Sequence, residues 1–134
     1  ETLPNMAEFF FLQADEERAH AMKFLHYLLE VGAQVAIPAV AAPKSDFSSA
    51  EEAVGAALTW ETEVTQQIYA LVDIANEDKD YISQRFLDYY VNEQLEEISM
   101  MDTLLNMVKK TGEANLFFLE NRIMELRPAE EGGE

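Results

Sequence analysis

Glu17-Arg18-Ala19-His20 is the stretch that decides how the rest of this sequence is interpreted. Residues three positions apart share one face of a helix, so the Glu17 carboxylate and the His20 imidazole can bind one ion together. The motif alone is weak, because acid-rich helices also contain it by chance. A solvated acidic face with a capping or packed histidine is the simpler alternative.

A long helix is predicted around this motif, over residues 4–31. Pro4 suits a first helical turn and Gly32 suits the end of a helix. Apolar side chains recur every three or four residues in two further long segments and in one short segment. The sequence therefore predicts three more helices, over residues 50–75, 80–110 and 113–126.

The connections between these helices indicate how they are arranged. Residues 76–79 form a short polar turn, so the second and third long helices should be antiparallel neighbours. Residues 32–47 form a long extended strap with two prolines. At roughly 3.3 Å per residue, such a strap can run the length of a helix of about 40 Å. The first and second long helices can then be parallel, as in all-α bundles with one long crossover.

Each long helix carries carboxylates on its own apolar stripe: Glu17 on the first, Glu61 on the second, and Glu93 and Glu97 on the third. A buried carboxylate without a partner costs several kcal/mol, and the few basic residues nearby cannot neutralise four of them. A bound cation would resolve this conflict. Oxygen ligands with one imidazole suit iron or manganese, and zinc is a further candidate.

The composition limits the class of protein. The 134 residues fit one domain, residues 1–134, with a Glu/Gly-rich tail at 129–134 that we expect to fray. Cysteine is absent, which excludes disulfides, thiolate metal sites and cysteine nucleophiles. The excess of 26 acidic over nine basic residues gives a net charge of −17, which disfavours nucleic-acid and membrane-surface roles and favours cations. No apolar run approaches the roughly 18 residues of a membrane span.

Several motifs resemble the non-haem bacterial ferritins, particularly their actinobacterial members. They are Glu-Glu-Arg-Ala-His-Ala-Met at 16–22, Gly32 with Ile37-Pro38, Trp60-Glu61, Tyr-Val-Asn-Glu-Gln-Leu-Glu-Glu at 90–97, and Gly112 with Asn115-Leu116-Phe117. The resemblance implies an all-α, ferritin-like four-helix bundle with a long crossover and a short C-terminal fifth helix. This chain would supply helices two to five. We therefore expect the native protein to be longer at its N-terminus.

The resemblance also implies a role for individual residues. Glu17 would bridge two irons, His20 would bind the first, and Glu61 and Glu97 would bind the second. Gln94 would line the place where dioxygen reacts. A third, weaker iron site would use Glu16, Glu93 and Glu96, with Glu97 shared.

Two departures distinguish the chain from related families. Met100 stands three residues after Glu97, where a bacterioferritin or rubrerythrin would have a second histidine. Arg18 stands where a bacterioferritin would have its haem-ligating methionine. We therefore expect no haem.

By resemblance, the protein is expected to be a cytoplasmic iron-storage ferritin, a homo-oligomer forming a 24-subunit cage. Its ferroxidase activity would oxidise Fe(II) to Fe(III) with dioxygen, and the ferric product would mineralise inside. One alternative is a di-iron oxidase or peroxidase that does not store iron. Another is an inactive structural subunit of a cage.

Overall fold

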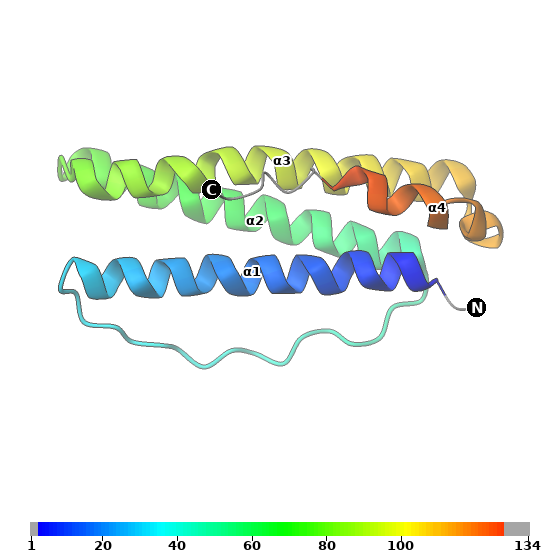
Figure 1. Cartoon of the computed structure of the whole chain (residues 1–134), viewed down its shortest axis with the longest axis horizontal. Coiled ribbons are helices and arrows are strands. Elements are labelled where there is room, and N and C mark those ends of the chain that lie inside the picture. Colours follow the sequence, from blue (N-terminus) through cyan, green and yellow to red (C-terminus); the bar gives the residue numbers. More distant parts are fainter. Residues whose placement is uncertain (1–2, 128–134) are drawn as a thin grey trace.

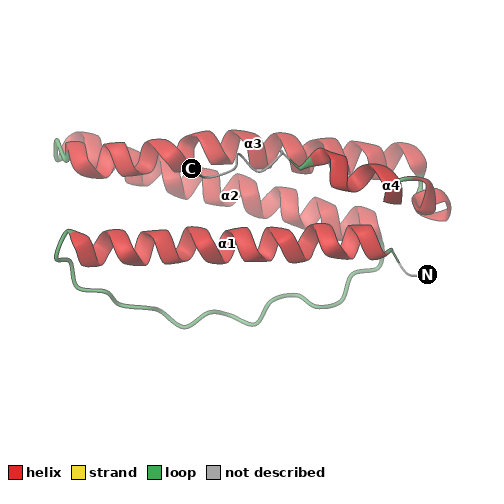
Figure 2. Ribbon diagram, viewed as in Figure 1, coloured by secondary structure: helices red, strands yellow, loops and turns green. Residues whose placement is uncertain are grey.

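The computed structural model describes residues 3–127, so the tail at 129–134 lies outside the described residues. Three long helices make up most of this part of the chain: α1 (Pro4–Glu30), α2 (Ala50–Glu77) and α3 (Tyr81–Thr111). Figure 2 shows helices and loops only. Each long helix begins and ends within two residues of its predicted bounds.

The predicted arrangement of the helices is confirmed. Helices α2 and α3 run antiparallel after the turn that joins them, and α1 and α2 run parallel (Figure 1). The strap that connects α1 to α2 runs back along the length of the bundle (Figure 1). It begins at Gly32, whose φ of +73° lies in the left-handed region that glycine adopts readily.

Polar side chains fix the N-termini of α2 and α3. Ser49 Oγ accepts a hydrogen bond of 3.0 Å from the Glu52 amide, while the Glu52 carboxylate accepts one of 2.7 Å from the Ser48 amide. Asp80 caps α3 by accepting a 3.0 Å bond from the Ser83 amide. These contacts satisfy amides that have no partner within their own helix.

The short helix predicted over 113–126 is present, but it is not one continuous α-helix. The segment consists of a 3-10 helix η1 (Glu113–Phe118), one turn of α-helix α4 (Glu120–Ile123) and a second 3-10 helix η2 (Met124–Leu126). Leu116 and Leu119 are both buried at a spacing of three residues, which matches the three residues per turn of a 3-10 helix. Packing of these side chains therefore prevails over the preference for a continuous α-helix.

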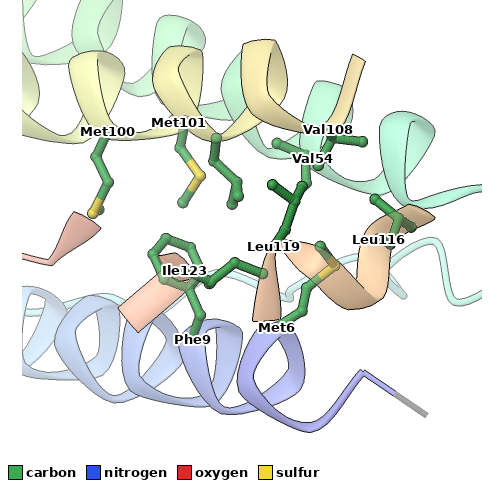
Figure 3. Close-up of a cluster of buried hydrophobic side chains, with 10 residues drawn as sticks. Met6, Phe9, Val54, Met100, Met101, Val108, Leu116, Leu119 and Ile123 are labelled. Atoms are coloured by element: carbon green, nitrogen blue, oxygen red, sulfur yellow. The ribbon is translucent and has the colours of Figure 1, made fainter. Parts of the chain in front are cut away.

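The hydrophobic core lies at the end of the bundle where α1 and α2 begin. Phe9 of α1, Val54 of α2 and Ile123 of α4 are fully buried there (Figure 3), and so is Leu104 of α3. The short C-terminal helices pack across this end and hold α1 against the α2–α3 pair. The core thereby fixes the relative register of the three helices that carry the acidic residues.

Aromatic rings pack α1 against α3 further along the bundle. Tyr27 stacks on Phe86 with ring centroids 4.0 Å apart, and Phe24 packs on Tyr90 at 4.4 Å. The acidic residues in the middle of the helices therefore lie between two apolar regions. Among the described residues, no helix is both long and apolar enough to cross a membrane.

Candidate metal centre

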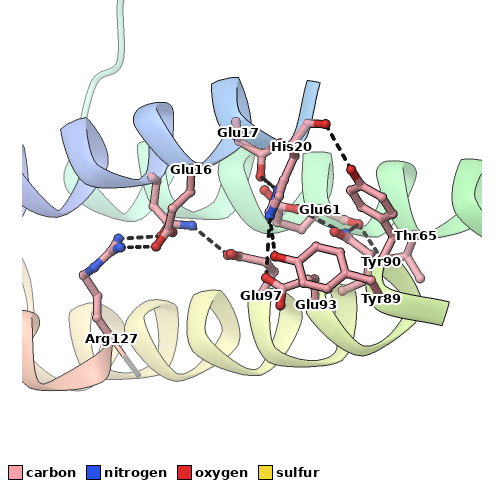
Figure 4. Close-up of polar contacts among 12 residues, drawn as sticks. Glu16, Glu17, His20, Glu61, Thr65, Tyr89, Tyr90, Glu93, Glu97 and Arg127 are labelled. Atoms are coloured by element: carbon pink, nitrogen blue, oxygen red, sulfur yellow. Dashed lines mark hydrogen bonds and ion pairs between the residues drawn. The ribbon is translucent and has the colours of Figure 1, made fainter. Parts of the chain in front are cut away.

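Three helices supply the side chains of the candidate site. Helix α1 carries Glu16, Glu17 and His20, α2 carries Glu61, and α3 carries Glu93, Gln94 and Glu97. Figure 4 shows these side chains directed into the space between the helices. Glu61, Gln94 and Glu97 are each at most 5 % exposed. The predicted burial of carboxylates on the inner faces is therefore confirmed for Glu61 and Glu97, whereas the side chains of Glu17 and Glu93 are 42 % and 29 % exposed.

His20 lies between two carboxylates. Its Nδ1 is 3.6 Å from Glu17 Oε1, and its Nε2 is 3.6 Å from Glu93 Oε2 (Figure 4). The Tyr90 hydroxyl donates a 3.0 Å hydrogen bond to the His20 carbonyl, which ties this turn of α1 to α3. The pKa of His20 is raised, chiefly by its contact with Glu17 and against the effect of burial. Both ring nitrogens thus face negative charge.

Gln94 holds Glu61 in place. Its Nε2 lies 3.2 Å from the Glu61 carbonyl, 3.2 Å from Glu61 Oε2 and 3.2 Å from Thr65 Oγ1. The Thr65 hydroxyl in turn donates a 2.8 Å bond to the Glu61 carbonyl. Burial raises the pKa of Glu61, and the hydrogen bond from Gln94 opposes that shift. This amide orients a carboxylate on a neighbouring helix.

Glu97 is the most perturbed acid of the site. Burial raises its pKa to about 7, and the nearby negative charges of Glu61, Glu16 and Glu17 add to this rise. Gln13 Nε2 opposes the shift by donating a 2.6 Å hydrogen bond to Glu97 Oε2. A cation near Glu97 would favour its ionised form. The Glu97 carboxylate therefore has negative charges and a neutral amide near it, and a bound cation would stabilise its ionised form.

Two residues near the site, Gln13 and Arg127, were not predicted to take part in it. Arg127 pairs with Glu16 and donates a 2.8 Å hydrogen bond to Gln13 Oε1 (Figure 4). Gln13 is visible in the sequence as a polar residue on an apolar stripe. Arg127 gives no such signal, because it lies 111 residues from Glu16 in the chain.

Glu96 is exposed and lines a cavity of about 380 Å³ together with Glu16, Glu93 and Glu97. The predicted residues thus form two adjoining groups, one around His20 and one around this cavity. Within residues 3–127, however, no three acidic or histidine side chains converge closely enough to hold an ion. The carboxylate oxygens instead contact other groups of the chain: Glu97 and Glu61 accept hydrogen bonds from side-chain amides, Glu17 lies beside an imidazole, and Glu16 pairs with a guanidinium.

Comparison with known proteins identifies the family. A family model described as a ferritin-like domain matches residues 1–111, which include all three long helices. The chain belongs to the ferritin family. The resemblance that the motifs indicate is thereby confirmed.

Individual ferritins cover nearly all of the chain. Ferritin BfrB of Mycobacterium tuberculosis is 38 % identical over 135 residues, which span 98 % of this chain and 74 % of that protein. A bacterial non-heme ferritin of Staphylococcus aureus is 39 % identical over 132 residues, with 98 % and 80 % covered.

The fold is shared with solved ferritin structures. An open pore ferritin from the hyperthermophilic archaeon Archaeoglobus fulgidus superposes with a TM-score of 0.88 at 32 % identity, covering 94 % of this chain and 78 % of that one. The three long helices and the short C-terminal helices therefore have the ferritin-like arrangement.

Proposed function

We propose that this chain is a subunit of an iron-storing cage that oxidises Fe(II) with dioxygen. Membership of the ferritin family supports iron storage in general. One observation supports the oxidation site: the His20 imidazole lies between Glu17 and Glu93, and Glu61 and Glu97 on the two neighbouring helices are buried with raised pKa values. Buried acids with no matching positive charge favour binding of a cation.

The proposed di-iron centre uses the residues around His20. Glu17 bridges the two irons, His20 binds the first, and Glu61 and Glu97 bind the second. Gln94 already donates to Glu61, so it fixes the direction of that carboxylate beside the reacting oxygen. A third iron site uses Glu16, Glu93 and Glu96, with Glu97 shared, around the cavity that these residues line.

Iron is the substrate, and the chain's own groups position it. Two Fe(II) ions supply two electrons, which with two protons reduce dioxygen to hydrogen peroxide and leave two Fe(III) ions. Glu97 must be ionised to bind iron, and because burial raises its pKa to about 7, iron competes with a proton for this carboxylate near neutral pH. Carboxylate oxygens are hard ligands and stabilise the more highly charged ferric product.

Storage requires a closed assembly, and we infer a homo-oligomeric cage of 24 subunits in the cytoplasm. Its interior is supplied with ferric product from the oxidation sites. The proposal includes no haem, because Arg18 stands where a haem ligand would be needed and an arginine side chain cannot serve as one.

A di-iron oxidase or peroxidase without storage is the second candidate. It would use the same four ligands, but it would have no use for a third site. The grouping of Glu16, Glu93 and Glu96 on one cavity favours storage over this alternative. An inactive structural subunit would leave the buried Glu61 and Glu97 without a function.

Aerobic addition of Fe(II) to the purified protein tests the proposal. The oxidation rate, the size of the iron-bearing particle and the number of irons per chain are measured together. We expect fast oxidation and far more than three irons per chain in a large particle. Iron held only at two or three per chain would support the oxidase, and absence of both oxidation and retained iron would overturn the proposal.

A further inference from the structure

Arg127 places a positive charge beside Glu16, one of the acids that line the cavity. Its guanidinium pairs with Glu16 and hydrogen-bonds to Gln13, as Figure 4 shows for the contact with Glu16. The Arg127 side chain is only 13 % exposed, whereas that of Glu16 is 43 % exposed. A guanidinium this well buried is held by specific partners rather than solvated at the surface.

Arg127 is also linked to Glu97, the buried acid of the proposed di-iron centre, through Gln13. Gln13 accepts a hydrogen bond from Arg127 through Oε1 and donates one to Glu97 through Nε2. Arg127 therefore fixes the orientation of the Gln13 amide, whose Nε2 donates a hydrogen bond to the buried Glu97 carboxylate. One side chain from the C-terminal segment is thus connected to Glu16 directly and to Glu97 through a single residue.

We propose that Arg127 competes with metal cations for Glu16. The guanidinium occupies this carboxylate in the metal-free chain, and a cation bound in the cavity must displace it. This inference rests on the proposed third iron site, to which Glu16 belongs. In this inference Arg127 lowers the affinity of the third site, so that iron leaves that site rather than remaining bound there.

The competition follows from the charges. A carboxylate with a charge-assisted partner must lose that partner before it can coordinate an ion, and this loss weakens the binding of the ion. Glu93, Glu96 and Glu97, the other acids on the cavity, have no lysine or arginine partner among the contacts within residues 3–127; Glu93 lies beside the imidazole of His20, and Glu97 accepts from Gln13. Glu16 is therefore the ligand on which Arg127 acts directly, and Glu97 is reached only through the neutral amide of Gln13.

Titration with Zn²⁺, which has no redox chemistry, tests the inference on the metal-free assembled protein. Calorimetry resolves the tighter and the weaker classes of sites. Glu96→Gln identifies the weaker class, because Glu96 is an exposed acid of the cavity with no contact to His20, so its loss should remove that class and keep the tighter one. Arg127→Gln should then tighten the weaker class by about tenfold, the equivalent of about 1.4 kcal/mol. Arg127→Lys, which keeps the charge but not the fork of donors, should tighten it less.

Arg122→Gln is the matched control, since it removes one positive charge from an exposed position on α4. It should change the affinity of the weaker class much less than Arg127→Gln does. Equal effects of the two substitutions, or weaker binding in Arg127→Gln with an unchanged melting temperature, would overturn the inference. If the Glu96→Gln titration is the same as that of the wild type, the third site itself is refuted, and the inference with it.

Discussion

The Glu120 carboxylate caps helix α1 from the far end of the chain. It accepts hydrogen bonds of 2.7 Å from the Asn5 amide and 3.2 Å from the Met6 amide, while Asn5 Nδ2 donates 2.8 Å to the Glu120 carbonyl. The residue that precedes α1, Leu3, offers no side-chain cap. Glu113 similarly accepts a 3.0 Å bond from the Glu51 amide of α2. The C-terminal segment thus supplies caps for two helices that begin at the same end.

Substitution of Glu120 by alanine should destabilise the metal-free protein by about 1–2 kcal/mol. The amides of Asn5 and Met6 lose their acceptor, and the N-terminus of α1 loses a negative charge that interacts favourably with the helix dipole. Unfolding in urea measures this loss. The exposed Glu125, in the adjoining 3-10 helix, provides the control Glu125→Ala. Similar losses from both substitutions would show that the cap has no particular importance.

Phe9→Ala should cost about 3–5 kcal/mol of unfolding free energy, because Phe9 is fully buried where α1 meets α4 and its removal leaves a cavity. Phe11→Ala is a close control, since the Phe11 side chain is 68 % exposed. We expect its effect to stay within about 0.5 kcal/mol. Comparable effects of the two substitutions in thermal or urea unfolding would contradict the position of the core.

The pKa of Glu97 predicts a specific pH dependence of stability. Because burial raises it from 4.5 to about 7, the unfolded chain loses this proton at lower pH than the folded chain. Glu97 should therefore contribute a fall in wild-type stability as pH rises from about 4.5 to 7, on the order of 3 kcal/mol. Glu97→Gln, measured without metal, should lack this contribution and become more stable relative to wild type across that window.

Glu96→Gln is the control for that measurement, because it removes an exposed carboxylate from the next position of the chain. Its stability difference from wild type should change far less between pH 4.5 and 7. A Glu97→Gln difference that stays constant over this range would mean that Glu97 titrates normally in the folded protein.

Iron oxidation should distinguish the two groups of acids. Glu17→Ala removes the carboxylate beside His20 Nδ1 and should slow the first rapid oxidation on the order of tenfold or more in stopped-flow absorbance. Glu93→Ala should leave that phase largely intact and alter later turnovers. Glu63→Ala, at an exposed position on α2, should affect neither. Oxidation at the wild-type rate in Glu17→Ala would place the site elsewhere.

The sequence predicts the long helices well because their limits depend on local chemistry. Pro4 opens α1, and Gly112, at a φ of +74°, closes α3. The burial of Glu61 and Glu97 was also predictable, since their spacing places them on apolar stripes. The apolar spacing of the first and second long helices extends to Val31 and Leu71, and there the expected burial fails, because these side chains are 48 % and 42 % exposed. There, fewer neighbouring elements are available to cover an apolar side chain.

Contacts between distant segments could not be predicted in the same way. The 3-10 geometry of residues 113–118 depends on the space available for Leu116 and Leu119 against the other helices. The partners of Glu16 and Glu97, namely Arg127 and Gln13, depend on where the C-terminal segment is placed by the core. Neither arrangement has a periodic pattern or a local motif that would indicate it.

The exposed strap between α1 and α2 is a segment into which residues could be inserted at little cost in stability. The entropy of closing a loop grows only with the logarithm of its length, so doubling the strap would cost about 0.6 kcal/mol. A single inserted residue within α3, by contrast, would rotate Gln94 and Glu97 by about 100° relative to the residues before them. Insertions are therefore tolerable in the strap, which must remain long enough to run along the outside of the helices. In α3 they would displace the proposed ligands, whose spacing depends on every residue between them.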